Sequence, residues 1–462
     1  MSQDAKTIRI GNGAGFWGDN LDAPKLLAEH GKLDYLTLEY LAELTLSILA
    51  HQRTKKPDAG FVTDVPTVVR DLVPFLDQER RRLKLVTNGG GMNPVGCARA
   101  TSEVLVESGL PEILVGAVSG DDLMPRLNKL LRAGETFENF ETGEPLGDLS
   151  EKIVSANVYL GYKGIADALA KEAQIVLTGR IADAALVVGP AMHEFGWQPD
   201  DWERLGGATV AGHLIECGAQ VTGGMYSDWD ESIDLNNIGY PIAELIHDGT
   251  CLITKPRKTG GTVTIGTVAE QLVYEIGDPT KYFTPDVVAD FSHVRLEQDK
   301  ANEVLVSGGT GTAAPDKLKV SMAYYDGFAT TGMIVVTGRN AEAKATAAGR
   351  AIKAKMNTAG FELDEFNVEL LGAGATLPGM DLWHRDAREI VLRISARDQR
   401  RQAIDRLTRE LAPLVTSGPP GVTGYTGARA RTRPVISYWP SLIDRSLVES
   451  VSDVKSAAEW LL

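Results

Sequence analysis

The chain has 462 residues, of which 43% are hydrophobic and 24% charged, a balance that excludes disordered and fibrous proteins. Its 62 acidic and 47 basic residues give a net charge of -15, which disfavours binding to nucleic acid or to an anionic membrane. The 3 cysteines have no CxxC spacing, and no apolar run is long enough to span a bilayer. We therefore expect a cytoplasmic globular protein with room for more than one domain.

The first half of the chain alternates short apolar runs with amphipathic stretches of helical period, a pattern typical of βαβ units. Asp22 with Pro24, and Asn93 with Pro94, have the form of helix starts. Strands are expected at 7–10, 35–38, 84–87, 113–117, 153–159 and 175–178. Because these strands are apolar throughout, helices should cover both faces of their sheet. Residues 1–310 are thus predicted to be an α/β domain with a doubly wound, mostly parallel sheet that carries the ligand site.

Beyond about residue 240 the pattern changes to short runs rich in Thr, Val and Gly. The run TVTIGTV at 262–268 is interpreted as part of a β-hairpin, and SGGTGTAAP at 307–315 as a linker. Strands at 317–325, 331–337, 367–372, 389–395 and 435–439 and helices at 341–359 and 399–414 are expected to follow. Two helices on one face of an antiparallel sheet predict a smaller α+β, ferredoxin-like domain over 311–462.

Charge is divided unevenly between these two predicted domains. Residues 1–310 carry a net charge of -18, whereas residues 311–462 carry +3. The basic groups of the second domain include Arg397, Arg400, Arg401, Arg406, Arg409, Arg429, Arg431 and Arg433. We expect this domain to serve docking or oligomerisation, with a homo-oligomer as the predicted state; binding of a coenzyme A phosphate by the arginines is the alternative.

The segment GAGFWG at 13–18 matches the GxGxxG pattern of dinucleotide-binding loops, and Glu39 follows at the end of the next strand. The helix start at Asp22 lies too far along for its N-terminus to meet a pyrophosphate, which disfavours nicotinamide binding. We interpret the loop instead as part of a substrate site, the alternative being a tight turn whose aromatic residues fill the core. Its candidate hydrogen-bonding groups are Asn12, Asp19 and Asn20.

The segment VTNGGGMNP at 86–94 places three consecutive glycines between a strand and a helix N-terminus. Backbone N–H groups can approach an anion closely there, so the segment predicts a site for a carboxylate or a phosphate. It lacks the Lys and the Ser or Thr of a nucleotide-hydrolysing loop. The alternative is that the glycines only pack a tight turn against a neighbouring strand. The candidate ligand-binding residues are Asn88, Gly89, Gly90, Gly91 and Asn93.

The segment TGRIADA places Arg180 after a strand and Asp183 near the start of the next helix. An arginine at this position suits a two-point contact with a carboxylate or a coenzyme A phosphate. Asp183 is a candidate to orient that arginine or to transfer a proton. An internal ion pair between the two side chains is the alternative.

The segment GHLIECGAQVTGG places His213, Glu216 and Cys217 on one turn of a predicted helix. Because residues i and i+3 share a helix face, His213 and Glu216 are candidates for an acid–base pair. A single HxxE pattern without a second cluster does not predict a metal site, and no oxyanion motif marks Cys217 as a nucleophile. A structural buried cluster is the alternative. The predicted catalytic residues are therefore His213, Glu216 and Asp183.

Several long segments together resemble the acyclic terpene utilisation AtuA family, a family defined by a domain of unknown function. They are IRIGNGAGFWGDN, LEYLAELTL, VTNGGGMNPVGCA, LTGRIADAAL, HEFGW and GHLIECGAQVTGG. The resemblance implies breakdown of citronellol- and geraniol-type terpenes, a route through branched acyl-CoA thioesters, but it implies no reaction and no catalytic residues. Longer members of the family carry a further small C-terminal domain, so the resemblance also implies a separately encoded partner of that type.

The leading hypothesis is an enzyme that acts on a branched carboxylic acid or its CoA thioester by addition or elimination, as a hydratase or lyase. Residues 89–91 and Arg180 would hold the anionic substrate, and His213 with Glu216, or Asp183, would move the proton. No cofactor is expected; coenzyme A enters only as part of the substrate. Two alternatives stay open: a non-catalytic subunit of a partner enzyme, and a hydrolase with a divalent metal at His213 and Glu216.

Overall fold

The computed structural model describes residues 6–76, 83–377, 387–425 and 429–462, and the chain divides into two compact units. Unit 1 comprises Met1–Ser150, Val154–Met322 and Tyr438–Leu462, and unit 2 comprises Glu151–Ile153 and Ala323–Ser437. Both units mix helices and strands, which confirms the predicted α/β class. Within the described ranges, none of the helices has the length and apolar character needed to cross a bilayer.

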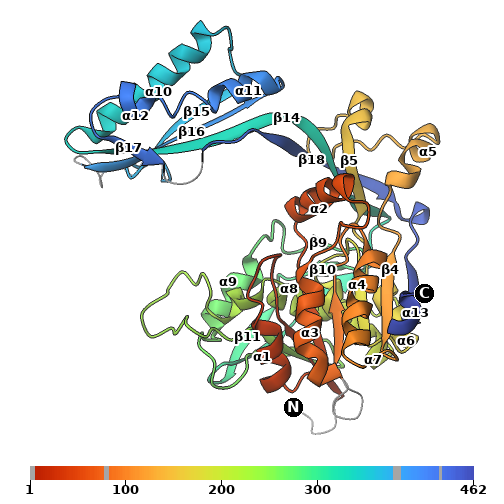
Figure 1. Cartoon of the computed structure of the whole chain (residues 1–462). Coiled ribbons are helices and arrows are strands. Elements are labelled where there is room, and N and C mark those ends of the chain that lie inside the picture. The colour runs from red at the N-terminus through yellow and green to blue at the C-terminus, as the bar shows by residue number, and fades with distance from the viewer. Residues whose placement is uncertain (1–5, 77–82, 378–386, 426–428) are drawn as a thin grey trace. The chain divides into compact units, whose positions relative to one another are not determined.

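Unit 1 is built on a ten-stranded sheet, part of which is visible in Figure 1. Five neighbouring strands of this sheet run parallel to one another. In spatial order these are β1 (Thr7–Asn12), β2 (Tyr35–Leu38), β3 (Lys84–Thr87), β6 (Ile175–Thr178) and β4 (Leu114–Ser119). Antiparallel strands extend the sheet at its two ends: β7 (Ile242–Ile246), β8 (Cys251–Thr254), β12 (Glu303–Ser307) and β11 (Arg295–Lys300) beside β1, and β19 (Val451–Ser456) beside β4. The predicted large sheet with a parallel centre is confirmed, while its doubly wound description stays a prediction. The strand predicted at 153–159 forms as β5 (Ile153–Val158) but is not part of this sheet, so its placement there is wrong.

Helices pack on both faces of the central strands, because successive side chains of a strand point to opposite faces. In β2, Tyr35 belongs to one buried apolar cluster and Leu36 to the other. The first cluster includes residues of α6 (Lys163–Ala170), α7 (Ala185–Phe195) and α8 (Trp202–Glu216). The second includes residues of α1 (Ala23–His30), α2 (Glu43–Lys55), α3 (Asp64–Leu76) and α4 (Pro94–Glu107). Burial on both faces explains why the strand sequences are continuously apolar.

The run at 262–268, predicted as part of a hairpin, instead leads into helix α9 (Ile265–Val273), so that prediction is wrong. Thr264 caps the helix: its hydroxyl oxygen accepts from the Thr267 backbone N–H at 3.2 Å, and the Thr267 hydroxyl oxygen accepts from the Thr264 N–H at 3.0 Å. The β-branched residues that suggested a strand thus form a reciprocal helix cap. The predicted linker contains β13 (Thr310–Thr312), which pairs with β10 (Val288–Asp290), and β10 in turn pairs with β9 (Tyr282–Phe283).

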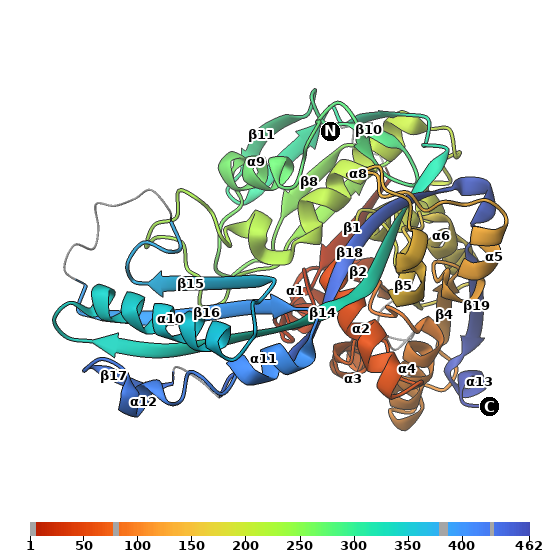
Figure 2. The same ribbon diagram turned by 90° about the horizontal axis from the view of Figure 1, so that it is seen from above.

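The last residues of the chain belong to unit 1, although the sequence pattern grouped them with the second domain. Strand β19 pairs antiparallel with β4, and the short helix α13 (Ala457–Trp460) follows it (Figure 2). Trp460 is buried, and its indole N–H donates to the Val115 carbonyl at 2.8 Å. An edge strand needs only backbone groups to pair, so the polar sequence of β19 gave no signal of its position.

Unit 2 contains an antiparallel sheet with two helices on one face (Figure 1). Its sheet contains β15 (Glu365–Leu371), β16 (Glu389–Asp398), β17 (Val422–Tyr425) and β14 (Lys317–Thr337), and β18 (Arg433–Asp444) also pairs with β14. The first residues of β14, up to Met322, and the last residues of β18, from Tyr438, are counted with unit 1. Helices α10 (Ala341–Thr358) and α11 (Arg401–Leu407) bury Ile352 and Ile404 against the sheet, and the short α12 (Leu414–Ser417) follows. The two strands predicted at 317–325 and 331–337 form one strand, since Gly327 accommodates a φ of +83° within it. The ferredoxin-like description stays a prediction.

Many of the C-terminal arginines form ion pairs inside unit 2. Arg400 lies 2.8 Å from Asp398, Arg406 lies 2.6 Å from Glu410, and Arg397 pairs with Asp326. The charges of these three arginines are therefore balanced within unit 2, so they give little reason to expect that they bind a partner molecule. A homo-oligomer stays a prediction.

Candidate functional site

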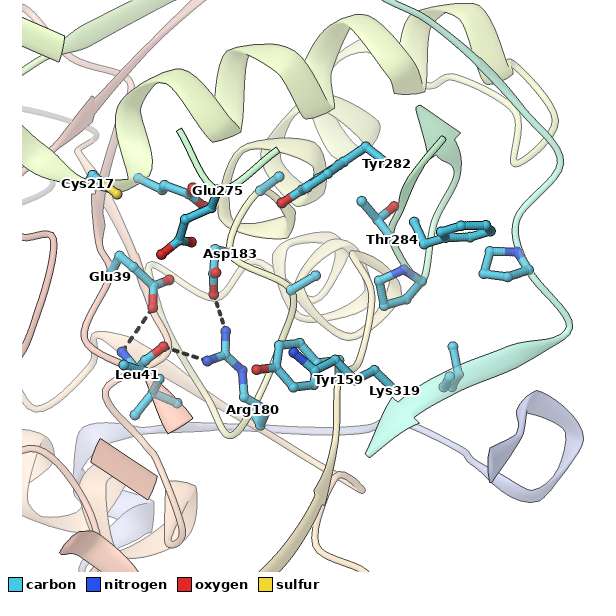
Figure 3. A pocket seen from close by; sticks show the side chains of 18 of the residues that line it. Glu39, Leu41, Tyr159, Arg180, Asp183, Cys217, Glu275, Tyr282, Thr284 and Lys319 are labelled. Atoms are coloured by element: carbon cyan, nitrogen blue, oxygen red, sulfur yellow. Dashed lines mark hydrogen bonds and ion pairs between the residues drawn. The ribbon is translucent and has the colours of Figure 1, made fainter. Parts of the chain in front are cut away.

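A cavity of about 700 Å³ in unit 1 lies at the carboxyl ends of the central parallel strands (Figure 3). Gly15 lines it from the loop after β1, Glu39 from the end of β2, and Arg180 and Asp183 from the loop after β6. Parallel strands bring their carboxyl ends to one edge of the sheet, and ligands of open α/β sheets bind at that edge. The cavity is therefore the candidate site.

Four carboxylates line one side of this cavity, and we call Glu39, Asp183, Glu216 and Glu275 the acidic cluster. Glu39, Asp183 and Glu275 turn toward a common space above Arg180 (Figure 3). Glu216 comes from the last turn of α8, and Glu275 follows the end of α9. Burial, and then the charge of Asp183, raise the pKa of Glu39; burial is also the first cause of the raised pKa of Glu216.

Glu39 lines the cavity, and one of its carboxylate oxygens is held by two hydrogen bonds. Its Oε1 accepts from the Leu41 N–H at 2.9 Å and from the side-chain amide of Asn88. Its Oε2 is buried and has no hydrogen-bond partner among the described residues. Burial, and the nearby charge of Asp183, raise the pKa of Glu39 well above its ordinary value. Glu39 can therefore carry a proton at a fixed position in the cavity.

Asn88, predicted as a ligand-binding residue, supports Glu39 instead. Besides donating to Glu39, it accepts from the Tyr40 N–H at 2.8 Å through its Oδ1. Asn88 is itself fully buried. Its two contacts fix the turn after β2 and with it the orientation of the Glu39 carboxyl group.

Arg180 is almost entirely engaged by the protein. Its side chain is 1% exposed; Nε donates to the Ile181 carbonyl at 2.8 Å, and Nη1 donates to the Leu41 carbonyl at 2.5 Å. Nη2 forms an ion pair with Asp183, the internal pair that was the alternative to ligand binding. A two-point contact with a ligand carboxylate would have to displace these acceptors, so the arrangement favours a structural role for Arg180.

Asp121, which follows β4, holds the backbone of Arg180 in place. Its Oδ2 accepts from the Arg180 N–H at 2.9 Å and from the Asn157 side-chain amide at 2.8 Å. Burial raises the pKa of Asp121 to about 6, although both hydrogen bonds favour its ionised form.

Replacing Asp121 by Asn is expected to make stability depend less on pH. The unfolded chain has an ordinary aspartate pKa of roughly 4, so between roughly pH 4 and pH 6 the folded state binds more protons than the unfolded state. The free energy of unfolding contributed by this group therefore falls as pH rises through that window. Between pH 4 and pH 7 the free energy of unfolding of wild type should fall by up to about 3 kcal/mol more than that of Asp121→Asn. Urea denaturation at both pH values measures this difference, and equal losses in the two proteins would contradict it.

His213 and Glu216 meet on one face of α8, with Nδ1 of His213 3.1 Å from Oε1 of Glu216. Nε2 of His213 lies 2.9 Å from the backbone carbonyl of Gln271, whose side-chain amide donates to the His213 carbonyl at 3.1 Å. Because a carbonyl can only accept, Nε2 carries a hydrogen, and Nδ1 faces Glu216. The two side chains predicted to form a pair are thus adjacent and buried, while their acid–base role stays a prediction.

The charge state of this pair follows from its burial. Burial raises the pKa of Glu216, while burial alone would lower that of His213; the hydrogen bond and charge of Glu216 outweigh it, so the pKa of His213 is raised. Glu216 lines the cavity, and its Oε2 is buried without a hydrogen-bond partner in the described ranges. Cys217 also lines the cavity, but burial, followed by the charge of Glu216, raises the pKa of its thiol, which disfavours a thiolate nucleophile.

Asn12 connects the end of α8 to the end of β1. Its side-chain amide donates to the carbonyls of Ile215 at 2.7 Å and Glu216 at 2.8 Å, and its Oδ1 accepts from the Thr37 hydroxyl at 3.1 Å. Asn12 is 1% exposed, so it positions Glu216 and does not line the cavity itself.

Asp19 and Asn20 also make internal contacts. Asp19 accepts from the Gly15 N–H at 2.8 Å and from the hydroxyl of Tyr240, and Asn20 accepts from the Asp22 N–H at 3.0 Å. The backbone of Cys217 approaches the loop so closely that position 15 requires a glycine, since a Cβ there would lie 2.7 Å from the Cys217 carbonyl carbon. The loop after β1 is thus built to meet the end of α8, and its predicted hydrogen-bonding residues shape the loop.

The three glycines after β3 are buried by neighbouring parts of the chain. A Cβ on Gly90 would lie 2.5 Å from the Thr178 carbonyl oxygen, and one on Gly89 would lie 2.4 Å from a methyl group of Val65. A Cβ on Gly91 would lie 2.5 Å from Leu49. Asn93 caps α4 by accepting from the Gly96 N–H at 2.9 Å. These contacts favour packing as the reason for the glycines, which was the alternative to an anion site at 89–91.

Much of the cavity wall carried no sequence motif. The residues missed are Glu39, Phe140, Tyr159, Glu275, Tyr282 and Lys319. Glu39 follows the carboxyl end of a strand, which is the signal that identified Arg180. For Glu39, however, the GxGxxG pattern suggested only a contact with the ribose of a dinucleotide. Phe140 lies in an acidic loop that resembles an ordinary solvated surface, and Lys319 comes from β14, far along the chain. Local patterns could not bring these residues to the site.

Exposed apolar side chains surround the entrance of the cavity. Phe140, Tyr274, Phe283 and Leu442 all line it, and Phe283 is 66% exposed. Large exposed apolar groups beside a concave site are typical of ligand-binding surfaces. The cavity therefore combines a polar, acidic interior with an apolar entrance.

Among the described residues, no three His, Cys, Asp or Glu side chains are arranged to hold a metal ion. In comparisons with known proteins, a family model described as acyclic terpene utilisation family protein AtuA matches residues 8–454. No curated protein and no solved structure matches the chain.

Proposed function

This chain belongs to the acyclic terpene utilisation family AtuA, and from that membership we propose that it is an enzyme of acyclic terpene or branched carboxylic acid catabolism. The proposed reaction is addition or elimination, of the hydratase or lyase type, on a carboxylic acid or its coenzyme A thioester. The family supplies the metabolic setting only. The reaction class rests on the chemistry of the cavity.

The observation that carries the proposal is a pair of buried carboxyl groups in one cavity. Glu39 and Glu216 both line it, both have a raised pKa, and each has one oxygen without a hydrogen-bond partner among the described residues. Elimination of water requires that one group accept a proton from carbon while another protonates the departing hydroxyl, so that a C=C bond forms and water leaves. One carboxyl group, in its ionised form, can accept the proton from carbon, while the other, whose raised pKa favours its protonated form, protonates the departing hydroxyl; addition is the reverse.

The other residues of the site support this pair. His213 lies behind Glu216 and can take up or return the proton that Glu216 exchanges with the substrate. Asp183 balances the charge of Arg180, and Asn88 orients Glu39. The apolar entrance suits a branched hydrocarbon chain.

The two alternative functions gain no comparable support. A non-catalytic subunit would have no use for buried carboxyl oxygens without partners, because burying such groups costs stability. A metal-dependent hydrolase at His213 and Glu216 needs a third ligand, and the described part of the chain supplies no such cluster.

Isotope exchange tests the proposal with a panel of compounds in place of a single substrate. The protein is incubated with branched 3-hydroxy and 2,3-unsaturated acids and their CoA thioesters in deuterated, ¹⁸O-labelled water, and products are examined by mass spectrometry. We expect one class of compound to gain deuterium at carbon and ¹⁸O at the hydroxyl position only when the protein is present. Absence of both labels from every compound would contradict the proposal.

A further inference from the structure

The cavity has a positively charged wall on the side away from the acidic cluster. Lys319 and Tyr159 lie together on one side of the cavity, and Glu39 and Glu275 lie on the other (Figure 3). The Lys319 ammonium is 4.7 Å from the centre of the Tyr159 ring, and the Arg180 guanidinium carbon is 4.4 Å from that same centre. The Tyr159 N–H donates to the Lys319 carbonyl at 2.9 Å, which fixes the two residues side by side.

Strand β14 contributes two lysines to this wall. Lys317 also lines the cavity, and as residues i and i+2 of β14 it and Lys319 project from the same face. Arg180 is paired with Asp183 and donates to two backbone carbonyls, so much of its charge is already used. The ammonium groups of the cavity are therefore concentrated on the part of its lining that β14 supplies, which we call the β14 wall.

An anionic ligand group would be repelled by the other side of the cavity. Each ionised member of the acidic cluster would repel an anion there, and in a partly buried site such like-charge repulsion is weakly screened. Apolar residues, among them Phe283 and Leu442, also line the cavity. A ligand with an anionic group attached to a hydrocarbon chain thus matches the β14 wall.

We propose that Lys319, seated on Tyr159 with Lys317 beside it, binds the anionic group of the substrate, and that the acidic cluster faces its uncharged reacting end. This assignment rests on the proposed function for the identity of the reacting end. It moves the anion from residues 89–91 and Arg180, where the sequence placed it, to β14. The ligand class is an aliphatic chain with an anion, carboxylate or phosphate, at one end and a hydroxyl or C=C bond at the other.

Binding measurements with simple probes test the anion site directly. Isothermal titration compares 3-methylbutanoate, its uncharged amide and inorganic phosphate, using wild type, Lys319→Gln and Lys319→Arg. Loss of a charge-assisted hydrogen bond should weaken binding of the carboxylate about tenfold or more in Lys319→Gln, and the amide should bind wild type about tenfold or more weakly than the carboxylate. Lys319→Arg keeps the charge and should retain most of the affinity. If phosphate binds more tightly than the carboxylate and also depends on Lys319, the anion is a phosphate and the site stands.

Lys300→Gln is the matched control, since it removes the same charge from an exposed residue of unit 1 outside the cavity. Equal affinity for the carboxylate and the amide, or Lys319→Gln indistinguishable from Lys300→Gln, would overturn the proposal. Thermal unfolding measures whether each variant is folded. If Lys319→Gln is not folded, Lys319→Arg keeps the comparison valid. These binding measurements need no turnover. If binding depends on Lys319 but no isotope exchange occurs, the proposed reaction is overturned and the anion site is not.

Discussion

Replacing Glu39 by Gln is expected to lower turnover by about 10²- to 10⁴-fold, the range lost when a general acid–base group is removed. The amide keeps an oxygen that can accept from the Leu41 N–H and from Asn88, so the turn after β2 should retain its conformation. It cannot exchange a proton with the substrate. The rate of water addition or elimination, with kcat and KM determined separately, measures the effect, and most of it should appear in kcat.

Glu29→Gln serves as the control for Glu39→Gln, because Glu29 is an exposed residue of α1 outside the cavity. Its turnover should match that of wild type. Thermal unfolding of both variants separates a loss of catalysis from a loss of folding. Turnover of Glu39→Gln within a few-fold of the Glu29→Gln value would remove Glu39 from the proton-transfer machinery.

Replacing Arg180 by Met is expected to lower the free energy of unfolding by about 2–6 kcal/mol, because each of two buried carbonyls left without its donor costs about 1–3 kcal/mol. The change would leave the carbonyls of Leu41 and Ile181 without their donor and Asp183 without its counter-charge, close to Glu39. Urea denaturation monitored by circular dichroism measures the loss. Met retains much of the aliphatic volume of arginine, so the variant reports on the polar contacts more than on packing.

The control for this second prediction is Arg204→Met, which breaks a partly exposed ion pair with Asp201. Such pairs contribute about 0–1 kcal/mol, so this variant should stay close to wild type. The double variant Arg180→Met with Asp183→Asn should be more stable than Arg180→Met alone, because the second change removes the uncompensated carboxylate. Arg180→Met losing no more stability than Arg204→Met would show that the guanidinium is not an internal support.

The sequence predicted the features that depend on local periodicity. Continuous apolar runs located the central strands, and the i, i+3 spacing brought His213 to Glu216. Both results follow from repeats that are intrinsic to strands and helices. The position of the cavity at the carboxyl ends of the strands was predictable for the same reason.

The identity of the residues that face the cavity was much less predictable. Asn12 and Asn88 follow or end strands as ligand-binding residues do, yet each is buried and holds a catalytic candidate in place. Gly90 is a glycine because the Thr178 carbonyl, from another strand, approaches it. A polar side chain at a strand end either faces the site or supports it, and the choice depends on packing between distant segments, which local sequence does not encode.

The pairing of β19 with β4 has a consequence for synthesis of the chain. Residues 438–462 are made only after the whole of 323–437, so the edge of β4 stays uncovered while unit 2 is produced. Unit 2 is nearly continuous in sequence and can fold first, whereas the sheet of unit 1 must wait for a strand more than 300 residues downstream of its neighbour. An unpaired edge of this kind is a site for wrong association, so the nascent protein should depend on chaperones at that stage.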